Sequence, residues 1–349
     1  MAQRQKANAG AYRQFKKDLS AGRLGRLYLF YGEETYLRDY YLNQMKKSLL
    51  RPGSEAFNFH ILQARECSVR ALEEAVNALP MMSERTLIAV YDYDLYKLPE
   101  AERAAAADVL NDLPDYVCLV FLYDLIPYKP DGRTKLAAVI KANGSAVEFT
   151  RQEQGDLVDW IRRRFHALDH DIDSRLCEYL ISLCGDLMNG LISEISKIGA
   201  YAKNRVITQA DIDAVATPQL DAVVFRMVDG VTAGNYDQAA VVLSDLLHMN
   251  EPPIRILAAF STQLRQLYCA RLVLEDRKGV GELMELCQMR SAYPARKLMG
   301  AAPRFSLTWC RAAVCAAAET DLAMKSVSGA DGGKLLIDLL LKLAQMKPK

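Results

Sequence analysis

The chain has 349 residues, which at roughly 150 residues per domain is enough for two or three domains with buried cores. It is 51% hydrophobic and 25% charged, a composition that is typical of globular proteins and argues against a disordered chain. The 44 Lys and Arg residues balance the 43 Asp and Glu residues to a formal net charge of +1. This balance argues against a protein whose affinity depends mainly on neutralising nucleic-acid phosphates.

The sequence carries no signal for a membrane or for secretion. Its longest apolar runs, such as Val117 to Tyr123, are far shorter than the ~20 residues that a membrane-spanning helix needs. The opening residues MAQRQKANAG lack the apolar core of a secretory signal. The eight cysteines form no Cys-x-x-Cys pair, so we expect buried, reduced thiols. We therefore expect a cytoplasmic protein without membrane contact.

The first ~150 residues alternate between strand patterns and helix patterns. Five strands separated by four helices predict a parallel sheet with helices on both faces. The predicted strands are 26–31, 57–62, 86–91, 117–123 and 146–149, and the predicted helices are 35–50, 69–79, 102–110 and 133–141.

After Thr150 the strand patterns end and amphipathic helices follow one another. A first group is expected within residues 151–217 and a second group within residues 218–349, with a linker at Thr217 to Gln219. The predicted fold class is therefore α/β plus all-α, with domains at 1–150, 151–217 and 218–349. The predicted helices are 154–168, 173–183, 186–201, 209–216, 223–231, 237–247, 253–275, 280–288, 295–299, 307–324 and 334–346.

Gly32 follows the first predicted strand and precedes a helix, where a phosphate-binding loop G-x-x-x-x-G-K-[ST] would lie. Counting from Gly32, the last three positions of that motif hold Leu37, Arg38 and Asp39. The second glycine and the hydroxyl that would hold magnesium are missing, and two glutamates follow Gly32 directly. Asp92, at the end of the third strand, lacks the usual acidic partner and is expected to be a turn residue. We expect a structural turn and no cofactor.

Other candidate sites have weaker signals. His166 and His170 are four residues apart among several aspartates, but no third ligand has metal-site spacing, so a polar helix end is favoured and no metal is expected. The basic run Arg162 to Arg164 is expected to be a solvated helix face, with contact to an acidic surface or nucleic acid as the alternative. No catalytic acid–base or nucleophile arrangement is present at readable spacing.

An apolar segment closes the second predicted helix just before a strand. Its residues are Leu79, Pro80, Met81 and Met82. Four apolar residues in a connection are unfavourable in solvent. Either the segment folds back into the core, or it forms an apolar plug for the pocket of a partner. The flexible methionine side chains suit a plug, and Pro80 would end the helix and present it.

Five segments, in the order in which the chain carries them, resemble the delta-subunit family of the clamp loader of bacterial DNA polymerase III. The resemblance runs from about Phe15 to the C-terminus, and it rests on order and spacing rather than on one motif. The segments are LYLFYGEETYLRDYYL, ALPMMSERTLIAVYD, GDLMNGLISEISKIGAY with ITQADIDAV, and LLHMNEPPIRILAAFSTQLRQLY.

The resemblance implies an AAA+-like subunit of three domains, namely a sheet domain, a helical lid and a helical collar, that has lost ATPase function. Such a subunit binds the ring-shaped sliding clamp, the beta subunit, and destabilises one ring interface. Its other partners are the gamma/tau and delta-prime subunits, with primed DNA bound only by the assembled loader. The collar joins the loader subunits, and no catalytic site is implied in this chain.

The family also implies roles for particular positions. Its clamp-binding element is an apolar wedge at the tip of the second helix of the first domain, and Leu79, Pro80, Met81 and Met82 (the apolar wedge) match that position. Relatives often place aromatic residues there, so two methionines are a departure. Met188 stands where ATP-binding relatives carry a sensor arginine, and the stretch Asp124 to Arg133 lacks their Ser-Arg-Cys motif.

Two alternatives remain open at this point. An active AAA+ ATPase in DNA replication or helicase loading would need nucleotide at Gly32, which Leu37, Arg38 and Asp39 disfavour. A DNA-binding initiator would need a concentrated basic face, which the balanced charge disfavours.

Overall fold

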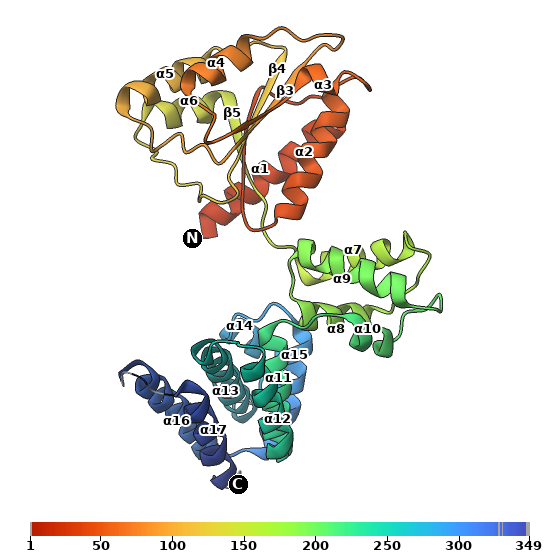
Figure 1. Cartoon of the computed structure of the whole chain (residues 1–349), viewed down its shortest axis with the longest axis vertical. Helices are drawn as coiled ribbons and strands as arrows, with labels where there is room; N and C mark the ends of the chain where they lie inside the picture. Colours follow the sequence, from red (N-terminus) through yellow and green to blue (C-terminus); the bar gives the residue numbers. More distant parts are fainter. Residues whose placement is uncertain (1, 327–328, 330, 347–349) are drawn as a thin grey trace. The chain divides into compact units, whose positions relative to one another are not determined.

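A computed structural model of the chain describes residues 2–326, 329 and 331–346 (Figure 1). The chain forms two compact units, Met1–Arg151 and Gln152–Lys349. Among the described residues, no helix is both long enough and apolar enough to cross a membrane.

The first unit is built on a five-stranded sheet in which every pair of neighbouring strands is parallel. The strand order is β2-β3-β4-β1-β5, so β1 lies between β4 and β5 and β2 is an edge strand. This confirms the predicted parallel sheet. The strands are β1 (Leu27–Tyr31), β2 (Phe59–Gln63), β3 (Thr86–Tyr91), β4 (Val117–Leu122) and β5 (Gly144–Glu148).

Helices cover both faces of this sheet, as is usual for parallel strands. Alternate residues of each strand point to opposite faces, so each strand contributes to two cores. In β1, Leu27 and Leu29 join a core with α4, α5 and α6, whereas Tyr28 and Phe30 join a core with α1 and α2. Figure 1 shows the two helical layers on either side of the strands. The helices are α1 (Ala2–Ser20), α2 (Thr35–Leu49), α3 (Glu55–Asn58), α4 (Val69–Asn77), α5 (Glu100–Asn111) and α6 (Lys135–Asn143).

The topology places the two candidate regions of the first unit at opposite edges of the sheet. The turn at Gly32 follows β1 and therefore lies at the carboxyl edge. The apolar wedge connects α4 to the first residue of β3, Thr86, and therefore lies at the amino edge. A ligand at one region would not overlap a partner at the other.

Two elements of the first unit differ from the prediction. No element is predicted before residue 26, but α1 is a helix whose Phe15 is buried against Tyr28 and Phe30. The strand predicted at 57–62 is β2, which begins at Phe59 because the short helix α3 occupies the residues before it. Asn58 is buried there, and its side chain donates back to the carbonyl of Ser54, one helical turn earlier.

The second unit is entirely helical apart from one isolated bridge between Asp171 and Val206, as far as the described residues extend. The predicted all-α region is confirmed. Its helices are α7 (Gln154–His166), α8 (Ser174–Cys184), α9 (Met188–Tyr201), α10 (Gln209–Val215), α11 (Leu220–Ala233), α12 (Tyr236–His248), α13 (Pro253–Glu275), α14 (Val280–Leu286), α15 (Ala292–Ala301), the 3₁₀ turn η1 (Ala302–Arg304), α16 (Leu307–Ser326) and α17 (Gly332–Gln345).

Helices from the two predicted helical domains contact each other within this unit. The Tyr179 and Tyr293 rings lie 5.8 Å apart between α8 and α15, and Arg296 pairs with Glu178 across the same helices. Arg290 also lies 3.4 Å from a carboxylate oxygen of Asp186. The division of this unit at residues 217 and 218 stays a prediction.

All eight cysteines are free thiols, as predicted, but they are not all buried. Cys118, Cys177, Cys184 and Cys310 are buried, three others are partly exposed, and Cys315 is exposed. Cys315 lies on α16 beside the buried Ala316 and Ala317, on the solvent face of that helix.

Candidate functional site

The apolar wedge stands out from the surface of the first unit. Leu79 is 74% exposed, Met81 57% and Met82 73%, and Pro80 is half-buried. The alternative that the segment folds back into the core is therefore wrong. Three neighbouring large apolar side chains in solvent are typical of a surface that binds a partner.

Local backbone chemistry explains why α4 ends where the wedge begins. Ala78 leaves the helical region with a ψ of 124°, and Pro80 has no N–H to continue the helical ladder. Met82 then adopts a φ of +61°, a left-handed conformation that is uncommon for residues other than glycine. The chain turns sharply here, which leaves the side chains on either side of the turn outside the core.

The buried side chain of Asn58 holds the backbone of the wedge. Its Oδ1 accepts a hydrogen bond from the Met81 N–H at 2.8 Å, and its Nδ2 donates to the Met81 carbonyl at 2.5 Å. Nδ2 also donates to the Ser54 carbonyl at 2.9 Å. Asn58 is fully buried, whereas the Met81 side chain is exposed. The wedge therefore has exposed side chains on a backbone that is held at Met81.

Arg85 fixes the chain on the other side of the wedge, just before β3. Its guanidinium donates to the carbonyls of Leu24 at 2.9 Å, Gly25 at 3.0 Å and Val117 at 3.1 Å. These carbonyls lie just before β1 and at the first residue of β4. The segment that follows the wedge is thus tied to β4 and to the chain just before β1.

The turn Gly32–Glu34, where a phosphate loop would lie, is closed against the end of β5. A Cβ on Gly32, whose φ is +121°, would lie 2.3 Å from the carbonyl oxygen of Phe149. The N–H of Glu34 donates to the same carbonyl at 3.0 Å. Glycine is required here for close approach to the neighbouring chain. This observation agrees with the prediction of a structural turn.

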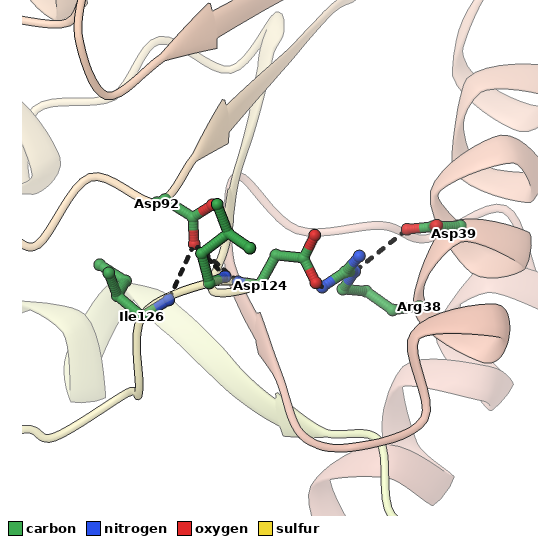
Figure 2. Close-up of polar contacts among 6 residues, drawn as sticks. Arg38, Asp39, Asp92, Asp124 and Ile126 are labelled. Atoms are coloured by element: carbon green, nitrogen blue, oxygen red, sulfur yellow. Dashed lines mark hydrogen bonds and ion pairs between the residues drawn. The ribbon is translucent and has the colours of Figure 1, made fainter. Parts of the chain in front are cut away.

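Arg38, at the position of the phosphate-binding lysine, is buried and paired with acids of this chain (Figure 2). Nε lies 3.0 Å from Asp39 Oδ1, and Nη1 lies 2.9 Å from Asp124 Oδ1. Burial lowers the pKa of the guanidinium, but the hydrogen bonds and charges of Asp124 and Asp39 outweigh burial and raise it. The positive charge that would meet a phosphate is neutralised internally.

The carboxylate of Asp92 organises the loop after β4. Its Oδ1 accepts hydrogen bonds from the N–H groups of Asp124 at 2.8 Å, Leu125 at 2.8 Å and Ile126 at 3.3 Å (Figure 2). Asp92 itself has a φ of +55°, a region that Asp tolerates better than most residues. This confirms Asp92 as a turn residue, and it also presents Leu125 to solvent, 87% exposed.

The candidate metal ligands have other partners. Both ring nitrogens of His170 face backbone carbonyls, Nδ1 that of Asn204 at 3.1 Å and Nε2 that of Gly199 at 2.9 Å. His166 lies 3.7 Å from Asp171. No group of three metal-ligating side chains occurs among the residues that the structure describes. His166 is the last residue of α7, and His170 follows that helix.

Two further positions from the sequence lie in the second unit. Arg162 and Arg163 are exposed on α7, while Arg164 lies over the ring of Trp160 at 5.5 Å. Met188 is buried at the start of α9.

Sequence models of one family match both units. The model of the DNA polymerase III delta subunit matches residues 28–150, and that of its C-terminal domain matches residues 221–343. The chain belongs to the DNA polymerase III delta subunit family. The resemblance predicted from the sequence is confirmed, and with it the α/β plus all-α fold class.

Individual members of the family are similar to the chain over most of its length. The DNA polymerase III subunit delta of Bacillus subtilis is 23% identical over 332 residues, which cover 93% of this chain and 94% of that protein. A probable DNA polymerase III subunit delta from Aquifex aeolicus is 23% identical over 269 residues, which cover 74% of this chain and 75% of that protein.

A solved structure shares the fold. The Bacillus subtilis DNA clamp loader delta protein aligns with a TM-score of 0.53 at 22% sequence identity. The alignment covers 96% of this chain and 100% of that structure. At this level of identity the similarity supports the fold, and the roles of individual residues rest on their own geometry.

Proposed function

We propose that this chain binds a sliding clamp through the apolar wedge and opens the ring for loading onto primed DNA, without binding ATP itself. The observation that carries the proposal is the exposure of Leu79, Met81 and Met82 on a fixed backbone, in a member of the delta-subunit family. The site residues that we assign to clamp binding are Leu79, Pro80, Met81 and Met82.

The chemistry of the wedge suits an apolar pocket. Burying a Leu or Met side chain completely stabilises a complex by about 1.5 to 3 kcal/mol, so three side chains can dominate an interface. Methionine adapts its three rotatable bonds to an irregular groove. The two methionines thus replace, in this chain, the aromatic residues that the family often uses.

Ring opening follows from differential binding. A wedge that binds the strained clamp interface more tightly than the relaxed one shifts the ring toward the open state. The shift cannot exceed the ratio of the two affinities. In this mechanism the chain supplies binding energy, and no bond is made or broken by its own side chains.

Three features support the absence of ATP binding. The Arg38 charge is neutralised by Asp39 and Asp124, the turn Gly32–Glu34 is closed against Phe149, and Met188 stands in place of a sensor arginine. A phosphate at Gly32 would have to break the Arg38 pairs and would compete with the carboxylate of Glu33, which is paired with Arg151. The alternative of an active ATPase is therefore disfavoured.

The remaining parts of the proposal concern assembly. We assign residues 1–150 to the clamp-binding domain, 151–217 to a lid and 218–349 to a collar. The collar would join this chain to gamma/tau and delta-prime subunits in the cytoplasm. ATP bound by those partners would control access to the wedge, and primed DNA would be held only by the assembled loader.

Release of a clamp from DNA tests the opening step. The sliding clamp of the same organism is loaded onto nicked circular DNA, and the purified chain is added without nucleotide. We expect the clamp to leave the DNA with the wild-type chain and to stay with the Met81→Asp, Met82→Asp double variant. Retention of the clamp in the presence of the wild-type chain would contradict the proposed opening activity.

A further inference from the structure

We infer that Asn58 is a positioning residue for clamp binding, which holds the Met81 peptide in the conformation that the wedge needs. The inference rests on the proposed function, since it concerns the same surface. Nothing in the sequence pattern of the wedge points to Asn58, which lies 23 residues before Met81. Three features of its surroundings assign this role to Asn58.

The first feature is the geometry of the pair. The Asn58 amide accepts from the Met81 N–H at 2.8 Å and donates to the Met81 carbonyl, so it bonds both polar groups of one residue. This is the pairing that a neighbouring β-strand would offer. A further hydrogen bond to the Ser54 carbonyl uses the second N–H of Nδ2 and fixes the orientation of the amide.

The second feature is the contrast in burial. Asn58 is fully buried, and a buried amide is retained at low energetic cost only where its hydrogen bonds are satisfied. Leu79, Met81 and Met82 are exposed, so their side chains contribute little packing to hold the loop. The conformation of the wedge therefore depends on contacts made by its backbone.

The third feature is the strained backbone beside the pair. Met82 has a φ of +61°, and such conformations persist only where the surroundings determine them. The bonds from Asn58 fix the residue directly before Met82. Releasing Met81 would let Met82 relax into an ordinary conformation, which would redirect the two methionine side chains.

Without the hydrogen bonds from Asn58, the backbone of the wedge would have to become ordered when the clamp binds. Fixing the backbone of one residue costs on the order of a factor of ten in affinity at room temperature. The Asn58→Ala variant is therefore expected to bind the clamp about tenfold or more weakly than the wild type, although every wedge side chain is still present.

Calorimetry with the sliding clamp of the same organism tests this inference. The set contains the wild type, Asn58→Ala, Met81→Asp with Met82→Asp, and the triple variant. Val120→Ala, which creates a cavity in buried β4 away from the wedge, serves as the control for general destabilisation. We expect Asn58→Ala to lose about tenfold in affinity, Val120→Ala to keep wild-type affinity, and the triple variant to bind no more weakly than the double variant.

Amide hydrogen exchange provides a readout without the clamp. Exchange at Met81 should become faster in Asn58→Ala, while exchange in β4 should change only with global stability. If a folded Asn58→Ala variant bound the clamp with wild-type affinity, or if exchange at Met81 were unchanged, the inference about Asn58 would be overturned. The proposed clamp binding by the wedge would not be affected by either result. Absence of clamp binding by the wild type would remove the proposed function, and the inference with it.

Discussion

Arg38 and Asp124 form an ion pair with an N···O distance of 2.9 Å at the carboxyl edge of the sheet (Figure 2). Arg38 is 4% exposed at its side chain, and it occupies the position at which a phosphate-binding loop carries lysine. The pair links α2 to the loop after β4, which Asp92 organises from β3. A region that would bind nucleotide in an ATPase is thus part of the structural framework of this chain.

The Arg38 pair should contribute to stability. Asp124→Ala removes one of two carboxylates from a buried guanidinium, and we expect a loss of about 1 to 3 kcal/mol in the free energy of unfolding. The loss is smaller than that for breaking a fully buried pair, because Asp124 is 38% exposed and Asp39 remains. Urea unfolding measures it, and an unchanged unfolding midpoint would contradict a structural role for the pair.

The wedge should act through its apolar side chains. Met81→Asp with Met82→Asp is expected to weaken clamp binding by at least about 100-fold, since two apolar contacts are replaced by charges that must be desolvated. The fold should be kept, because both side chains are exposed and Asp tolerates the positive φ of Met82.

A matched control lies at the other edge of the same sheet. Leu125 is 87% exposed, so it is an apolar side chain in solvent like Met81 and Met82. The Leu125→Asp variant replaces it by a carboxylate, as the wedge variant does at the two methionines. We expect this variant to bind the clamp with wild-type affinity in the same titration. Equal losses in both variants would mean that the effect is not specific to the wedge.

The sequence predicts the sheet and the wedge because both are local apolar patterns. β3 and β4 are buried almost throughout, so their apolar runs identify them without further information. Leu79, Met81 and Met82 are recognisable because a connection with such residues is unusual. The sequence left open whether they face the core or the solvent, and the structure decides this.

The sequence does not predict the contacts that hold these elements. Asn58 lies between two phenylalanines and fits a strand pattern, and its partner Met81 lies 23 residues away. The helix α1 lies outside the predicted elements although Tyr12, Phe15 and Leu19 have helical spacing, because these three residues follow a polar stretch and form only a short pattern. Long-range side-chain to backbone bonds leave no periodic signal.

The hydrogen bonds of Asp92 predict a graded response to substitution. Asp92→Asn keeps an acceptor oxygen and tolerates the positive φ, so we expect a loss of about 1 kcal/mol in unfolding free energy. Asp92→Ala leaves three N–H groups without this acceptor and is expected to cost about 2 to 3 kcal/mol. Denaturant unfolding of both variants measures which of them loses more unfolding free energy. An Asp92→Ala variant that is more stable than Asp92→Asn would contradict the assigned role.

Alkaline pH should destabilise the first unit through Tyr28. Burial raises the pKa of the Tyr28 hydroxyl from 10.0 to about 12. The unfolded chain loses this proton near pH 10, but the folded chain retains it until about pH 12. The contribution to stability, roughly 2 to 3 kcal/mol, is therefore complete below pH 10 and is lost as the pH rises toward 12.

Urea unfolding from neutral pH to about pH 11 tests this linkage. The Tyr28→Phe variant should be less stable at neutral pH, because the Gly25 N–H loses its acceptor at 2.7 Å. Its stability should then fall less steeply above pH 10 than that of the wild type. Parallel curves for the two proteins would show that Tyr28 does not contribute to alkaline unfolding.

Clamp binding with and without nucleotide tests the central claim most directly. Calorimetric titration of the purified chain with the sliding clamp of the same organism would be run first without nucleotide and then with magnesium and ATP. We expect tight binding that does not change with ATP, and no heat when ATP is titrated into the chain alone. Absence of clamp binding, together with measurable ATP binding by the chain alone, would contradict this claim and favour an active ATPase.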